Sequence, residues 1–234
     1  IISHPDVEKE IAPYITKLIP GNNCLARINL QYDGASQALT TEVSSDEFLD
    51  EAEKYCEGID LKHFYQKIDV FDELKAIDQW DLSDEELKHN LELLGSFSAE
   101  FSFSISPTRD DVEKFLYKHH TLPCDSLKGV ILYRNAFSIS SYEGKKDWLG
   151  FGKRSRKSPA AATHPTGSWR VRENQMAGKV EIDKRRNAAL QDLSNRQGLD
   201  ENIFYELFVE IVLAGIKEFE RYRQNIIRHI NVKN

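Results

Sequence analysis

The stretch Phe97-Ser-Ala-Glu-Phe-Ser-Phe-Ser-Ile105 decides the fold class, because apolar and polar side chains alternate along it without a break. A period of two residues is typical of a strand with one face in the core and the other in water. The chain has 234 residues, of which 40% are hydrophobic, so it can bury a core and a wholly disordered chain is excluded. The alternation therefore predicts a half-buried sheet.

The residues after this stretch predict the rest of an α+β domain. Thr108 opens a helix that runs to about His119, and Asp200 caps a long helix over about Glu201–Ile230. Three further strands are expected at Gly129–Tyr133, Ala136–Tyr142 and Met176–Ile182. This β-α-β-β-loop-β-α order predicts helices on one face of a mixed sheet.

The first part of the chain is acidic and predicts a different organisation. Residues 1–100 carry 8 Lys and Arg against 22 Asp and Glu, whereas the remainder has a positive balance. Spacing and caps predict one strand and four helices: Leu25–Tyr32 as the strand, and Asp6–Ile19, Ser45–Glu57, Leu61–Ile77 and a segment after the Ser83–Glu86 capping box as helices. We therefore expect residues 1–96 to form an acidic, mainly helical segment that could pack on the same sheet, and residues 97–234 to form the α+β domain.

A basic segment interrupts the predicted strands. Residues 144–173 show no periodicity, and they carry eight Lys and Arg side chains interleaved with aromatic residues. Cations and aromatic rings in a loop suit contacts with nucleic acid or polyphosphate. The candidate contact residues are Lys153, Arg154, Arg156, Lys157, Arg170 and Arg172. The alternative is a solvated loop that contacts the acidic part of the chain.

Other site signatures are weak. Gly150-Phe-Gly-Lys153 resembles a phosphate loop, but Arg154 follows the lysine where Ser or Thr is required, and no helix is expected next. His119, His120 and Cys124 do not predict a metal site, because adjacent imidazoles on a helix point apart. No stretch is long enough to cross a membrane, and three cysteines without a Cys-x-x-Cys motif suit a reducing, cytoplasmic setting. The start at Ile1 suggests a piece of a longer polypeptide.

The loop before the long helix holds the sharpest candidate residue. Arg196 lies in Leu193-Ser-Asn-Arg-Gln-Gly-Leu199, between a strand and a helix, where a guanidinium can reach outward to a phosphate. The structural alternative is that Arg196 pairs with Asp192 or Glu201.

Five motifs in the same order carry a family resemblance over about residues 97–225. They are Tyr133-Arg-Asn-Ala-Phe137, Tyr142-x-Gly144, Asp147-Trp-Leu-Gly150, Asn174-Gln-Met-Ala-Gly-Lys-Val-Glu-Ile182 and the Arg196 block. Together they resemble bacterial GHKL-type ATPases related to the heat-shock chaperone of the ninety-kilodalton class, to MutL and to MORC. The nucleotide-binding motifs of that family, Asn-x-x-Asp and Asp-x-Gly-x-Gly, are absent from this sequence.

The resemblance implies a transducer domain with the fold of the second domain of ribosomal protein S-five. It implies that Arg196 contacts the γ-phosphate of ATP held with Mg²⁺ by a preceding module, and that Asn195 and Gln197 lie at the same contact. The family has an acidic residue where this chain has Gln197. By this reading the chain alone is not an active ATPase and holds no cofactor of its own.

Two further hypotheses stand beside this one. In the first, the basic segment makes the chain a nucleic-acid-binding module. In the second, the long C-terminal helix pairs two copies into a homodimer.

Overall fold

One seven-stranded sheet organises the part of the chain that the computed structural model describes, which is residues 24–77, 80–118, 129–135, 137–144, 146–158, 169–193 and 198–233. The strand order is β3-β2-β1-β4-β7-β5-β6, and among the pairs formed by these described strands only β5–β7 is parallel. The strands are β1 (Ala26–Asp33), β2 (Ala38–Ser45), β3 (His63–Asp69), β4 (Phe97–Phe103), β5 (Gly129–Arg134), β6 (Phe137–Glu143) and β7 (Met176–Ile182). The predicted α+β class is therefore confirmed.

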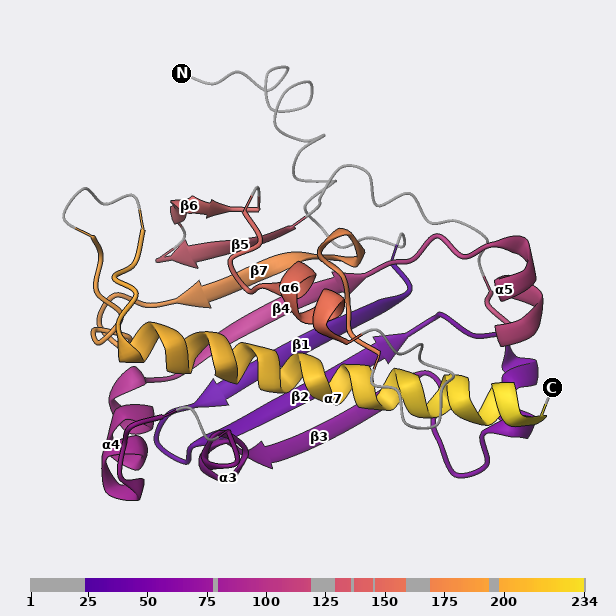
Figure 1. Cartoon of the computed structure of the whole chain (residues 1–234), viewed down its shortest axis with the longest axis horizontal. Helices are drawn as coiled ribbons and strands as arrows, with labels where there is room; N and C mark the ends of the chain where they lie inside the picture. The colour runs from indigo at the N-terminus through magenta and orange to yellow at the C-terminus, as the bar shows by residue number, and fades with distance from the viewer. Residues whose placement is uncertain are drawn as a thin grey trace, which may run out of the picture.

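A single long helix, α7 (Ile203–Lys233), lies across one face of this sheet (Figure 1). Its apolar side chains, such as Phe208 and Ile211, are buried against the strands. The helix approaches closely at Gly215, where a Cβ atom would come within 2.6 Å of the Leu30 side chain. The predicted long helix is thus present, and its apolar stripe packs on the sheet of its own chain.

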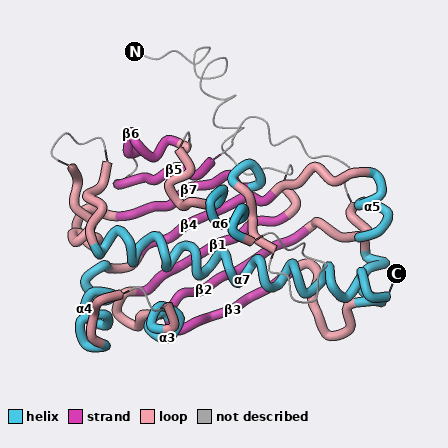
Figure 2. Tube along the Cα trace, viewed as in Figure 1, coloured by secondary structure: helices cyan, strands magenta, loops and turns pink. Residues whose placement is uncertain are grey.

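The shorter helices lie on the α7 side and at the rims of the sheet (Figure 2). They are α3 (Val70–Lys75), α4 (Asp84–Leu94), α5 (Arg109–Phe115), α6 (Phe151–Lys157) and the 3-10 helices η2 (Asp50–Tyr55) and η3 (Glu173–Gln175). The predicted capping box is confirmed, since Ser83 Oγ accepts from the Glu86 amide and the Glu86 carboxylate accepts from the Ser83 amide at 2.8 Å.

The opposite face of the sheet carries polar side chains. Along β1, buried Ala26, Ile28, Leu30 and Tyr32 alternate with exposed neighbours. The same alternation in β4 places its serines and Glu100 on the face away from α7. β1 pairs antiparallel with both β2 and β4, and antiparallel strands are stable with one face solvated, so this half-buried pattern agrees with the predicted one.

Two helix predictions for the acidic segment are wrong, and one strand was missed. The expected helix at Leu61–Ile77 is the edge strand β3 followed by the short helix α3, and the expected helix at Ser45–Glu57 is only η2. Strand β2 was not predicted at all. Phe64 and Ile68 fit a helix because they are four residues apart, but four is also a multiple of two, and both pair with apolar residues of β2.

The sheet crosses the predicted boundary at residue 96. Strand β1 from the acidic segment pairs with β4 along its length, for example Ala26 with Phe103. The segment 144–173, expected to lack regular structure, contains α6, and η3 begins at its last residue. The predicted helix at Asp6–Ile19 lies outside the described residues.

Among the described helices, none has both the length and the apolar composition that crossing a membrane requires.

Candidate functional site

The predicted phosphate-contact loop is described only at its two stems. Asn195, Arg196 and Gln197 fall in the undescribed residues 194–197, so their side chains are not placed. The stems face each other in an antiparallel bridge between Asp192 and Leu199. Two 2.9 Å backbone hydrogen bonds close the base, from Leu193 N–H to Gly198 C=O and from Asp200 N–H to Gln191 C=O.

Arg134 braces this base from the end of β5. Its Nη1 atom lies 2.7 Å from Asp192 Oδ1, and its second terminal nitrogen donates to the Leu190 carbonyl. Only 10% of the Arg134 side chain is exposed. Asp192, which the sequence offered as a partner for Arg196, is therefore paired with Arg134.

A buried asparagine fixes the chain just before the loop. The Asn187 side chain is fully buried, and its Nδ2 donates to the carbonyls of Leu94 at 2.8 Å and Ser96 at 3.2 Å. Its Oδ1 accepts from the Asp183 amide at 2.8 Å. The segment that leads into the loop is thus anchored on the start of β4 as well as on β5.

The Asp147-Trp-Leu-Gly150 motif has a packing role in this structure. Trp148 Nε1 donates to the Val130 carbonyl at 2.8 Å, and the Asp147 carboxylate accepts from the amides of Phe151 and Gly152 at 2.9 and 2.7 Å. The expectation that no helix follows is wrong, because α6 begins there. The first amides of α6 are nevertheless occupied by a carboxylate, so they do not form a phosphate loop.

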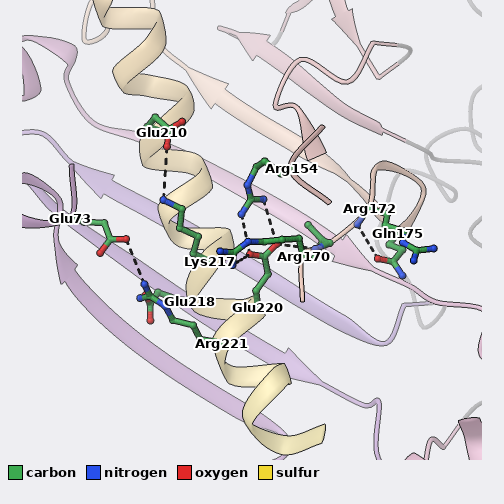
Figure 3. Close-up of polar contacts among 11 residues, drawn as sticks. Glu73, Arg154, Arg170, Arg172, Gln175, Glu210, Lys217, Glu218, Glu220 and Arg221 are labelled. Atoms are coloured by element: carbon green, nitrogen blue, oxygen red, sulfur yellow. Dashed lines mark hydrogen bonds and ion pairs between the residues drawn. The ribbon is translucent and has the colours of Figure 1, made fainter. Parts of the chain in front are cut away.

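The six candidate cations of the basic segment separate into two groups. Arg154 and Arg170 both bind the carboxylate of Glu220 on α7, each at 3.0 Å, and Glu220 is 1% exposed (Figure 3). The Val171 amide also donates to Glu220, at 2.8 Å. These two arginines therefore tie both stems of the segment 159–168 to one buried group.

The other four cations are exposed. Lys153, Arg156 and Lys157 lie on one side of α6, at spacings of three and four residues, and Arg172 lies beside η3 with its backbone bonded to Gln175. No ion pair of these four side chains is found among the described residues. They are the members of the predicted set that an anionic ligand can reach.

A second buried charged centre lies one turn along α7. Arg223 binds Glu47, and it also donates to the Tyr117 hydroxyl at 2.9 Å and lies over the Trp169 ring at 4.4 Å. Burial raises the pKa of Glu47 despite the charge of Arg223, and burial raises the pKa of Tyr117 to about 12. Burial alone would lower the pKa of Arg223, but Glu47 and Tyr117 outweigh that effect and the pKa is raised.

A basic turn after β7 was not singled out from the sequence. Lys184, Arg185 and Arg186 are consecutive and exposed, and Arg186 lines a groove on the polar face of the sheet. The sequence does carry a pattern that indicates this turn. Three consecutive cations lie between Asp183 and Asn187, and Asp and Asn are residue types that favour turns.

The described ranges contain no group of three or more His, Cys, Asp or Glu side chains that could hold a metal ion, and His119, His120 and Cys124 lie outside them.

No protein-family model matches this chain, and no curated protein matches it.

Proposed function

We propose that this chain is the transducer segment of a GHKL-type ATPase related to the ninety-kilodalton heat-shock chaperone. In this role Arg196 contacts the γ-phosphate of ATP held by a preceding nucleotide-binding module. The observation that supports the proposal is the closed base of the Arg196 loop, which Arg134 braces through Asp192. A braced base suits a residue that must meet a phosphate at a defined position.

The chemistry follows from the guanidinium group. Its planar set of donors fits two phosphate oxygens, and a fixed cation stabilises negative charge as it develops in phosphoryl transfer. Asn195 and Gln197 flank Arg196 and would contact the same phosphate group. Mg²⁺ and most of the nucleotide contacts would come from the preceding module.

The position of the loop also suits a coupling role. Leu199 closes the loop base, and α7 begins at Ile203 and then packs against β1 and β2. A contact that forms only when the γ-phosphate is present would pull on the end of this helix. Nucleotide state would then bias the placement of the transducer against the preceding module.

The test is ATP turnover by the full-length polypeptide that contains the preceding module. We expect Arg196→Ala to lower kcat by about 100-fold while ATP binding is retained, because one preorganised donor is lost. Arg196→Lys should recover part of the rate, and Arg172→Ala is the matched exposed-arginine control. Equal turnover by wild type and Arg196→Ala would remove the proposal.

The exposed side of α6 favours a second candidate function, nucleic-acid binding through the basic segment. Lys153, Arg156 and Lys157 point to solvent, whereas Arg154 is held by Glu220. Replacing the three exposed residues by Gln should weaken binding of a DNA or RNA probe and reduce its salt dependence. Absence of binding by wild type at about 50 mM salt would exclude nucleic-acid binding through the basic segment.

Homodimer formation and a cytoplasmic location stay predictions.

A further inference from the structure

A groove of about 430 Å³ opens on the polar face of the sheet, at the end of β7. The helix α7 begins near the same end of the sheet, on the other face (Figure 1). Four adjacent strands form its floor through one row of paired residues: Gln31 in β1, Ser98 in β4, Glu181 in β7 and Tyr133 in β5. Its volume falls in the range of about 300–1,000 Å³ in which small ligand groups are bound. The floor offers an amide, a hydroxyl, a carboxylate and a phenol ring.

Arg186, the last residue of the basic turn Lys184–Arg186, lines one side of the groove, and the side chains of Asn135 and Asp183 hold the backbone of this turn. Asn135 Oδ1 accepts from the Lys184 amide at 2.7 Å, and Asp183 Oδ1 accepts from the amides of Arg185 and Arg186 at 2.8 and 2.9 Å. Asn135 Nδ2 in turn donates to Asp183 Oδ2 at 2.6 Å. The β5–β6 turn and the basic turn therefore fix each other.

A third anchor comes from the α4–β4 junction. A Cβ atom on Gly95 would lie 2.0 Å from the Arg186 carbonyl oxygen, so only glycine allows this contact. An exposed turn that merely connects two elements does not require anchoring from three directions. A turn that presents charged groups at fixed positions does.

The charges around the groove favour an anionic ligand. Glu181 is paired with Lys179 at 2.9 Å, and both oxygens of Asp183 accept hydrogen bonds. The side chains of Lys184, Arg185 and Arg186 form no ion pair within the described ranges. Both acidic residues that line the groove therefore have partners, whereas Arg186, which also lines it, and the adjacent Lys184 and Arg185 keep their charged groups available to a ligand.

We propose that this groove binds single-stranded nucleic acid, with backbone phosphates on Lys184–Arg186 and one base against the Tyr133 ring. An unpaired base can leave its stack and lie on an aromatic side chain, whereas a base in a duplex cannot. Gln31, Ser98 and Glu181 lie in reach of the edge of such a base as donors and acceptors. This role goes beyond the proposed ATPase function and does not depend on Arg196.

The experiment measures binding of a fluorescein-labelled 12-nucleotide single strand to the 234-residue chain by anisotropy, over a series of salt concentrations. Arg185→Gln/Arg186→Gln should weaken binding by about 10-fold or more and make the salt slope shallower by about 1.4, which is the effect of two lost phosphate contacts. Tyr133→Leu should weaken binding by about 10-fold and leave the salt slope unchanged, because stacking releases no counterions. Tyr133→Phe should bind as wild type does.

The control is the triple variant Lys153→Gln/Arg156→Gln/Lys157→Gln on α6, with melting temperatures recorded for every protein. Loss in the groove variants but not in the α6 variant supports the groove. Loss in the α6 variant alone overturns the groove and favours the second candidate function. Absence of binding at about 50 mM salt, or equal affinity for a duplex of the same length, also overturns it.

Discussion

Glu47 and Arg223 form a buried ion pair with 2.6 Å between Arg223 Nη2 and Glu47 Oε1, although 176 residues separate them in sequence. The two side chains are 1% and 4% exposed. Glu47 belongs to the acidic part of the chain, and Arg223 lies near the end of α7. This contact therefore joins the two parts of the chain that the sequence divided at residue 96.

Removing one partner of this pair should destabilise the protein strongly. Glu47→Leu leaves an uncompensated guanidinium in the core, so we expect a loss of about 3–5 kcal/mol in the free energy of unfolding. Arg223→Met should cost a similar amount. The double variant should be less destabilised than the sum of the single variants, because neither charge remains. Urea unfolding measures all four proteins, and strictly additive losses would contradict the coupling.

Glu220 binds two arginines, so replacing it should also lower the stability of the protein. Glu220→Gln removes the charge that Arg154 and Arg170 both bind, so the two cations are left facing each other (Figure 3). We expect a loss of about 3 kcal/mol and a change in Trp169 fluorescence, since Trp169 adjoins Arg170 and packs on Phe103 with 5.7 Å between ring centroids.

Glu210→Gln is the control for this variant on the same helix. Glu210 lies 3.9 Å from Lys217, and both side chains are partly exposed, so its loss should cost about 1 kcal/mol or less. Equal destabilisation by the two variants would show that Glu220 does not hold the basic segment.

The sequence predicts correctly the strands and helix caps whose pattern depends on neighbouring residues alone. The alternation at Phe97–Phe103 and the Ser83 capping box each depend on a few adjacent residues, and both are present as expected. β3 was misassigned because its apolar residues also fit a helical period, and only the pairing with β2 distinguishes the two. β2 is rich in Thr and Ser, so its buried Leu39 and Val43 gave a weak signal.

The candidate site was predicted less well, for a related reason. The six candidate cations of the basic segment look alike in sequence, and the pairing of Arg154 and Arg170 with Glu220 depends on a contact across at least 50 residues. The braced base of the Arg196 loop likewise needs Arg134, which is 58 residues from Asp192. Residue types could be read from the sequence, but the partners that decide their roles could not.

Two glycines with positive φ offer a matched comparison of strain and clash. Gly95 has φ of 73° and would place a Cβ atom 2.0 Å from the Arg186 carbonyl, whereas Gly58 has φ of 79° and open space around it. Gly58→Ala should cost about 1–2 kcal/mol from backbone strain alone. Gly95→Ala should cost at least about 2 kcal/mol more, because the basic turn must move. Thermal unfolding compares the two, and equal losses would contradict the close approach at Gly95.

The Asp183 carboxylate should make stability depend on pH in the acid range. Hydrogen bonds from the amides of Arg186 and Arg185, and then from Asn135, lower the pKa of Asp183. A carboxyl group with a lower pKa in the folded state binds fewer protons there than in the unfolded state. Its stabilising contribution is therefore complete above the unfolded pKa of about 3.9, and it is lost as the pH falls through the folded pKa.

Asp183→Asn isolates this contribution from those of other acids with lowered pKa values, such as Asp33 and Asp60. Wild type should be more stable than the variant at pH 7, and the difference should shrink progressively below about pH 4. Urea unfolding at several pH values measures the difference, and carboxyl-carbon NMR gives the titration midpoint directly. A difference that stays constant down to pH 2, or an Asp183 midpoint at or above about 3.9, would show that the amides of the basic turn do not hold the ionised carboxylate.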